Sequence, residues 1–176
     1  IRDRLKISCW NTDWATPSSK RGKFFSDKFD SDIICLTEGY ETLLPQDGYI
    51  ISSNEDYGYK IQKGRRKVIL WSKNKWTEVN QIGSKEIPTG RFISGVTNGI
   101  KIVGLCIPWR FAHVSTGRKD RKPWEDHLSF IKNLSFSNEK TIILGDFNQN
   151  IPKKNQPEIV FSSLKNMIDG FNLLTT

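Results

Sequence analysis

Thr141-Ile142-Ile143-Leu144-Gly145-Asp146-Phe147-Asn148 is the stretch that decides the predicted fold. A short, continuous apolar run that ends at a glycine is typical of a buried strand. An acid and an amide follow it two residues apart, at the carboxyl end of the strand, where open α/β sheets bind their ligands. A plain turn is the alternative, because Gly, Asp and Asn all favour turns.

Two further predicted strands end in the same kinds of side chain. Residues 5–10 alternate apolar and polar positions, which predicts a strand with one apolar face, and Asn11 and Asp13 follow it. Residues 32–37 predict a buried strand, and Glu38 follows it. Carboxylates and amides at three strand ends suggest one convergent site. Hard oxygen ligands without a His or Cys cluster fit Mg²⁺ or Mn²⁺ and argue against zinc.

The remaining segments predict a mixed α/β fold. Helices are expected at residues 20–29, from Pro123 onward, and from Pro157 to a stop at Gly170. Asn98-Gly99 predicts a hairpin turn, and residues 108–122 form an irregular, basic loop that is longer than an ordinary connection. Hairpins mixed with strand–helix units favour a two-layer or four-layer α/β sandwich. Strands are expected at residues 48–53, 67–71, 76–82, 91–96 and 100–107, with another beginning at 171.

Composition describes one globular domain over residues 1–176, with 36% hydrophobic and 26% charged residues. No apolar run approaches the ~20 residues that a membrane span needs, and the charged start lacks the apolar segment of a signal peptide. Cys9, Cys35 and Cys106 lie apart in apolar segments, which predicts buried free thiols and a reducing, cytoplasmic location. Because the chain begins with Ile1, a fragment or a trimmed chain is expected.

An excess of positive charge predicts a polyanionic partner. Lys and Arg number 27 against 19 Asp and Glu, a net charge of +8, and basic side chains displace counterions from phosphates. The alternative is a basic protein without such a partner. Basic clusters near aromatic residues are typical of surfaces that bind nucleic acid, so we expect DNA in preference to RNA, no membrane and no obligate protein partner. The substrate-binding candidates are Trp109, Arg118, Lys119 and Arg121.

Three motifs resemble, in order, those of the endonuclease/exonuclease/phosphatase superfamily. Each motif is weak alone, but the ordered set at these separations is specific. The resemblance implies a four-layered α/β sandwich of two mixed β-sheets flanked by helices, and a divalent-metal phosphoesterase. The motifs are Ser8-Cys9-Trp10-Asn11-Thr12-Asp13, Ile34-Cys35-Leu36-Thr37-Glu38 and Ile143-Leu144-Gly145-Asp146-Phe147-Asn148.

The resemblance also implies a role for each strand-end residue. Glu38 is similar to the principal metal ligand, with Asp13 and Asn11 close to the metal or the scissile phosphate. Asp146 is similar to the group that orients or deprotonates the attacking water, and Asn148 to a hydrogen-bond donor to a phosphate oxygen. Turn capping is the alternative for both asparagines, and surface solvation is the alternative for Asp13.

The chain departs from the family pattern in two places. Where the family commonly has a Tyr or His near the phosphate, this chain has Cys106, which its setting predicts to be a core thiol; Arg110 or His113 is then expected to supply the contact. The family ends with an Asp-His pair. Asp126-His127 precedes the Gly-Asp-Phe-Asn motif, so we reject that match and expect a polar helix position or a hydrogen-bonded residue at the core edge. The chain is therefore expected to be incomplete at the C-terminus, lacking its last strands, or to be a degenerate member.

These observations predict a Mg²⁺-dependent nuclease, with Mn²⁺ as an alternative metal. A phosphatase or phosphodiesterase that acts on a small or lipid-linked phosphate would use the same chemistry, and fold analogy cannot separate the two. A third hypothesis is a non-catalytic module that binds nucleic acid without cutting it.

Overall fold

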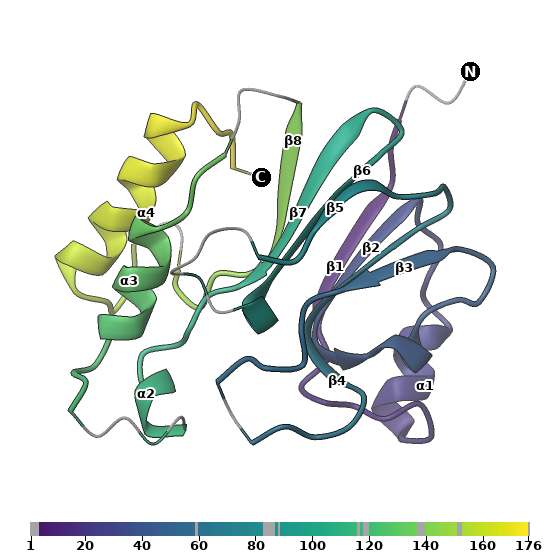
Figure 1. Ribbon diagram of the computed structural model, residues 1–176, viewed down its shortest axis with the longest axis horizontal. Helices are drawn as coiled ribbons and strands as arrows, with labels where there is room; N and C mark the ends of the chain where they lie inside the picture. Colours follow the sequence, from purple (N-terminus) through teal and green to yellow (C-terminus); the bar gives the residue numbers. More distant parts are fainter. Residues whose placement is uncertain are drawn as a thin grey trace.

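The computed structural model describes residues 4–58, 60–82, 87, 89–115, 117, 120–136, 140–150 and 153–175. Within these ranges, eight strands and four α-helices form two β-sheets with α1 on one outer side and α3 and α4 on the other (Figure 1). The strands are β1 (Ile7–Asn11), β2 (Ile33–Tyr40), β3 (Tyr49–Ser52), β4 (Arg65–Ser72), β5 (Thr77–Asn80), β6 (Phe92–Thr97), β7 (Ile100–Cys106) and β8 (Thr141–Asp146). The helices are α1 (Lys20–Ser26), α2 (Ala112–Ser115), α3 (Glu125–Lys132) and α4 (Glu158–Gly170), with 3-10 turns η1 (Glu41–Leu43) and η2 (Thr89–Arg91).

Both sheets are mixed, which confirms the predicted fold class. The first has the order β1-β2-β4-β3, in which β1 runs parallel to β2 while β4 is antiparallel to both β2 and β3. The second has the order β5-β6-β7-β8, in which only β7 and β8 are parallel. Because parallel neighbours end at the same edge of a sheet, β1 and β2 deliver their carboxyl ends together, and so do β7 and β8.

The core has three layers of buried side chains. Along β2, Ile33 and Cys35 face the second sheet while Ile34 and Leu36 face the other way, as the period of two requires. The layer between the sheets contains Ile33, Cys35, Val68, Leu70, Ile93, Ile102 and Cys106. The layer on the outer face of the first sheet contains Ile34, Leu36, Leu43, Leu44, Ile69 and Trp71. The layer under α3 and α4 contains Ile87, Phe92, Val103, Leu105, Ile107, Phe130, Ile131, Leu134, Leu164 and Met167.

Several local predictions are confirmed, and others are wrong. Asn98 and Gly99 both have positive φ, 53° and 69°, between β6 and β7, as an Asn-Gly hairpin requires. Residues 171–174 form no strand in the part of the chain that the structure describes. The helix expected from Pro123 begins at Glu125, because residue 124 has left-handed backbone dihedrals. Within the described ranges, no helix has both the length and the apolar character needed to cross a membrane.

Two segments predicted to be buried are more exposed, because they are edge strands. β8 is half-buried along its whole length, since β7 is its one neighbour in the sheet. Cys9 is exposed on β1, the edge of the other sheet, whereas Cys35 and Cys106 are buried; all three thiols are free. The carboxyl ends of β1 and β8 therefore lie at open edges, where side chains can meet solvent.

Candidate functional site

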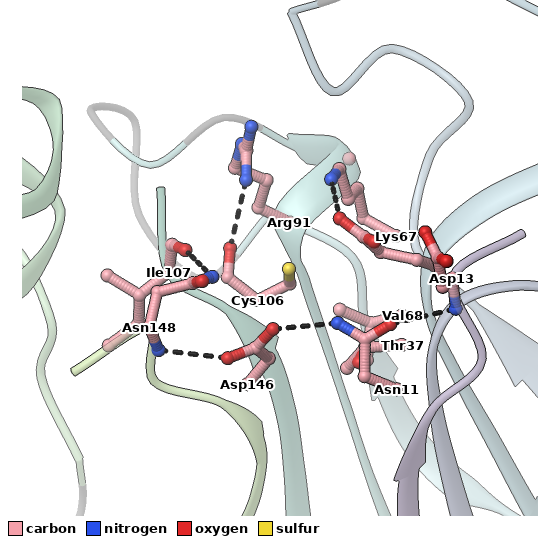
Figure 2. A network of polar contacts seen from close by, with 12 residues as sticks. Asn11, Asp13, Thr37, Lys67, Val68, Arg91, Cys106, Ile107, Asp146 and Asn148 are labelled. Atoms are coloured by element: carbon pink, nitrogen blue, oxygen red, sulfur yellow. Dashed lines mark hydrogen bonds and ion pairs between the residues drawn. The ribbon is translucent and has the colours of Figure 1, made fainter. Parts of the chain in front are cut away.

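The ends of β1 and β8 meet across the two sheets. Ile142 and Leu144 pack against the layer between the sheets, so the alternation of a strand carries Asp146 to the same face. The same alternation carries Asn11 inward after Ile7. Asn11 Nδ2 donates a hydrogen bond of 2.8 Å to Asp146 Oδ2, which joins residues 135 positions apart (Figure 2). The predicted convergence of these two strand ends is therefore seen in the structure.

Asp146 is held in one orientation by three neighbouring features. Its Oδ1 accepts a hydrogen bond of 2.9 Å from the backbone N–H of Asn148, whose φ is +51°. Asn148 Nδ2 donates 2.8 Å to the carbonyl of Ile107, which fixes this turn to the end of β7. Gly145 has φ +136°, and a Cβ there would lie 1.8 Å from the Leu105 carbonyl oxygen, so only glycine permits this approach. Both carboxylate oxygens keep lone pairs with which they can accept a water proton.

Turn capping, the alternative role for both asparagines, is seen for Asn11, whereas the side chain of Asn148 bonds across to Ile107. Asn11 Oδ1 accepts 2.9 Å from the Asp13 backbone N–H, while its amide nitrogen serves Asp146. Asn148 donates one of its two amide hydrogens to the carbonyl of Ile107. An amide has a second hydrogen, which can donate to a substrate oxygen. For Asn11, capping and site formation are therefore compatible, because its oxygen and its nitrogen serve different partners.

The sequence predicts that Glu38 follows the end of its strand. In the structure it lies within β2, which continues to Tyr40. Its φ of +53° turns the backbone, and its carboxylate forms an ion pair with Lys67 of β4. The turn after β1 is anchored here, because the Glu38 carbonyl accepts 2.7 Å hydrogen bonds from Trp14 N and Thr12 Oγ1. Asp13 belongs to this turn, but its side chain is 72% exposed and pairs with Arg21 at 2.8 Å, an arrangement that surface solvation also explains.

Cys106 lies among the charged groups of the site. It pairs in register with Asp146, and burial raises the pKa of its thiol to about 11. The positive charges of Lys67 and Arg91 oppose this rise in pKa, whereas the negative charges of Asp146 and Glu38 add to it. Two cations and two carboxylates thus surround a thiol that stays protonated near neutral pH, as expected for a core cysteine.

Arg91 is a site residue that the sequence pattern did not identify. It is buried at the end of η2, directly before β6, and its Nη1 donates a hydrogen bond of 3.2 Å to the Cys106 carbonyl (Figure 2). Its local sequence reads simply as the polar beginning of an apolar strand. Only the pairing of β6 with β7 brings this guanidinium to the site, and that pairing is a tertiary property.

The residues at the site fit a magnesium ion with few protein ligands. Mg²⁺ usually takes one or two carboxylates and completes its octahedron with waters and substrate phosphate. Glu38 supplies such a carboxylate, and the hydroxyl of the next residue back, Thr37, is buried and has no hydrogen-bond partner among the residues that the structure describes. No cluster of three or more His, Cys, Asp or Glu side chains placed for metal binding occurs in the described ranges.

Three of the remaining predicted site residues, Trp109, Arg110 and His113, lie around the ring of Phe111. The rings of Trp109 and Phe111 are 5.5 Å apart and nearly perpendicular. The guanidinium of Arg110 lies 4.7 Å from the Phe111 ring, and the ring of His113 lies 6.2 Å from it. Arg121 pairs with Glu125 at 2.9 Å. Arg118 and Lys119 lie outside the described residues.

A buried histidine connects the two loops that border the site. His127 of α3 is fully buried, and its Nδ1 lies 2.9 Å from the Pro108 carbonyl, which can only accept; Nδ1 therefore carries the proton. Its Nε2 then accepts from the Gln149 amide at 2.9 Å, and Gln149 Oε1 accepts from Gln156 at 3.1 Å. This is the hydrogen-bonded core-edge residue that the sequence allowed, and it fixes residues 108 and 149 relative to one another.

The chain also matches a known protein family by sequence. The sequence profile of the endonuclease/exonuclease/phosphatase family matches residues 10–153, which include all three strand ends of the site. The chain belongs to this family. Its members include nucleases and phosphatases, so this membership gives the general class of chemistry but not the substrate. No curated protein sequence matches the chain.

Solved structures agree with this membership at the level of the fold. An AP endonuclease from Archaeoglobus fulgidus has a TM-score of 0.68 and 16% identity over 94% of this chain and 70% of its own. The 3′ phosphatase NExo from Neisseria, bound to a product DNA hairpin, has a TM-score of 0.60 and 16% identity over 94% and 71%. Beta toxin from Staphylococcus aureus, with bound magnesium ions, has a TM-score of 0.56 and 16% identity over 98% and 71%.

Proposed function

We propose that this protein is a divalent-metal-dependent phosphodiester hydrolase that cuts nucleic acid, with DNA preferred over RNA. The observation that carries the proposal is the fixed orientation of Asp146 at the junction of the two sheets. A carboxylate held in place by two donors keeps the orientation it needs to accept a proton from an attacking water. The net charge of +8 supports a polyanionic substrate.

Each site residue then has a specific task. Glu38 would hold Mg²⁺, or Mn²⁺ in its place, with Asp13 and the Thr37 hydroxyl as the nearby oxygen groups. The bound metal supplies Lewis-acid stabilisation of the charge that develops on the phosphate. Asp146 orients the water and takes its proton, and Asn11 keeps Asp146 in position.

The substrate phosphate would lie between Asn148 and the buried cations. The second amide hydrogen of Asn148 can donate to a non-bridging oxygen, and the positive charges of Lys67 and Arg91 favour an anion there. Arg110 and His113 remain candidates for a further phosphate contact. On the loop around residues 108–122, Trp109, Arg118, Lys119 and Arg121 are the candidates for binding the rest of the nucleic acid.

The test compares two site variants with a matched surface variant. Glu38→Gln and Asp146→Asn each remove one negative charge from the site, whereas Asp169→Asn removes one from an exposed ion pair with Lys165 on α4. With double-stranded DNA and Mg²⁺, we expect cleavage rates to fall by about 10²–10⁴ in the two site variants and to stay unchanged in Asp169→Asn.

A substrate panel separates the alternatives. It contains single-stranded and double-stranded DNA, RNA, and phosphorylated small molecules including lipid-linked phosphates. Turnover confined to the small phosphates would favour a phosphatase, and salt-sensitive DNA binding without turnover at any Mg²⁺ or Mn²⁺ concentration would favour a binding module. Cleavage that persists in a chelator would refute the metal-dependent mechanism.

A further inference from the structure

The ammonium group of Lys67 is buried where the proposed site holds its metal. Only 3% of the Lys67 side chain is exposed, and it forms its ion pair with Glu38, whose side chain is 21% exposed. An unpaired buried ammonium would be costly, so Glu38 neutralises Lys67 in the metal-free protein. The carboxylate proposed to bind Mg²⁺ is therefore already bound to a cation that belongs to the chain.

Two aromatic rings hold Lys67 from another side. Its Nζ lies 5.2 Å from the ring of Trp14 and 5.7 Å from the ring of Tyr57, distances at which cation–π attraction operates. These rings stack on each other at 5.6 Å, and Arg65 covers the Trp14 ring at 4.8 Å. The ammonium would keep these two contacts even if the Glu38 carboxylate turned toward another cation.

We infer that Lys67 is a resident counter-ion of Glu38 that a divalent cation has to displace, so that Lys67 sets the metal affinity of the site. The inference rests on the proposed metal-dependent function. When a metal binds Glu38, the ion pair between Glu38 and Lys67 has to break, which costs free energy. The ammonium of Lys67, kept close by the aromatic rings, then repels the metal. Both effects weaken metal binding in the absence of substrate. Lys67 acts through Glu38 and is in this respect a positioning residue.

The test measures Mn²⁺ binding to the substrate-free protein by calorimetry and by electron paramagnetic resonance. Lys67→Met removes the charge but keeps the length of the side chain, and we expect it to bind Mn²⁺ about tenfold more tightly or better, which corresponds to ~1.4 kcal/mol. Lys67→Arg keeps the charge and should bind Mn²⁺ like the natural protein. Lys73→Met is the matched control, because Lys73 forms a more exposed ion pair with Asp32.

The outcomes separate this inference from the proposed function. Unchanged or weaker Mn²⁺ binding in Lys67→Met would overturn the role of Lys67 while leaving the metal requirement intact. Absence of Mn²⁺ binding in Lys67→Met as well as in the natural protein would overturn the inference, whereas the metal-dependent function is tested separately by DNA cleavage with and without a chelator. Because no turnover is measured, a wrong substrate does not affect the result.

A second measurement uses the natural protein, in case Lys67→Met does not fold. Amine labelling, followed by mass spectrometry, reports how readily each lysine reacts. We expect saturating Mg²⁺ to increase labelling at Lys67, since the ammonium is released from Glu38, and to leave Lys73 unchanged. Labelling of Lys67 that does not respond to Mg²⁺ would contradict displacement.

Discussion

Replacing His127 by Phe tests whether one buried imidazole holds the two loops of the site together. The substitution keeps an aromatic ring against Trp124, which meets the His127 ring edge-on at 5.1 Å. It removes the hydrogen bonds to the Pro108 carbonyl and to Gln149. The Pro108 carbonyl is left without its donor in a buried setting, at a cost of about 1–3 kcal/mol. Gln149 is only half-buried and can turn to water, so its loss is nearer the ~1 kcal/mol of an ordinary hydrogen bond.

The expected loss in unfolding free energy is therefore about 2–4 kcal/mol, measured by urea denaturation with an unchanged slope. Asn133→Ala is the control, because it removes an exposed hydrogen bond of 2.9 Å to Ser129 near the same helix and should cost ~0.5 kcal/mol. A His127→Phe protein within about 0.5 kcal/mol of the natural protein would refute the linking role of His127.

The same variant has a second, pH-dependent signature. Burial lowers the pKa of His127 from its ordinary value of 6.5, against the opposing effect of the Pro108 hydrogen bond. As pH falls below 6.5, the unfolded chain takes up a proton that the folded chain refuses, so the unfolding free energy falls. The contribution of one site cannot exceed about 1.4 kcal/mol per pH unit. His127→Phe should lack this component of the slope, and identical slopes in the two proteins would contradict the sign of the shift.

Three further substitutions or reagents test other parts of the site. Gly145→Ala should lower the free energy of unfolding in urea by about 3 kcal/mol or more, since φ is +136° and the new Cβ would meet the Leu105 carbonyl. A loss below ~1 kcal/mol would show that β8 can shift. Asn148→Ala should lower the free energy of unfolding by about 0.5–1.5 kcal/mol, because it removes the hydrogen bond to Ile107. Under the proposed function it should also reduce kcat by ~10²–10³, and an unchanged kcat would exclude a phosphate contact of Asn148. A thiol reagent near pH 8 should modify the exposed Cys9 before Cys106. A hydrogen bond from Cys35 lowers the pKa of Cys9, whereas burial raises the pKa of Cys106. Equal rates of modification at the two cysteines would contradict this order.

The strand ends of the site could be predicted from the sequence because they depend on local patterns. A period of two along residues 5–10 and an apolar run before Gly145 are visible in the chain, and parallel pairing brings such ends together. The resemblance to a known family added the order of these ends and the chemistry expected of them. The edge positions of β1 and β8 could not be predicted, because strand order is set by long-range pairing. The exposure of Cys9 and the half-burial of β8 follow from that order.

The buried charged contacts of the site could not be predicted, because they join segments whose local sequences give no indication of the contact. Lys67 and Arg91 are ordinary basic residues at the beginning of apolar strands, and a buried cation there is the exception to the general rule. Only the pairing of β4 with β2 brings Lys67 close to Glu38. The link between His127 and Gln149 joins α3 to the segment after β8, and the local sequence of neither segment indicates it.

The charged groups around the site nearly cancel one another. In the metal-free protein, the two carboxylates of Asp146 and Glu38 are offset by the two cations Lys67 and Arg91 around the Cys106 thiol. A divalent cation alone would make this group strongly positive, and a phosphodiester alone would bring its negative charge close to the two carboxylates. When both bind, most of the added charge cancels, so each should favour the other. Under the proposed function, a site built in this way would hold its metal most tightly when the substrate is present, and Lys67 is the residue on which that coupling depends.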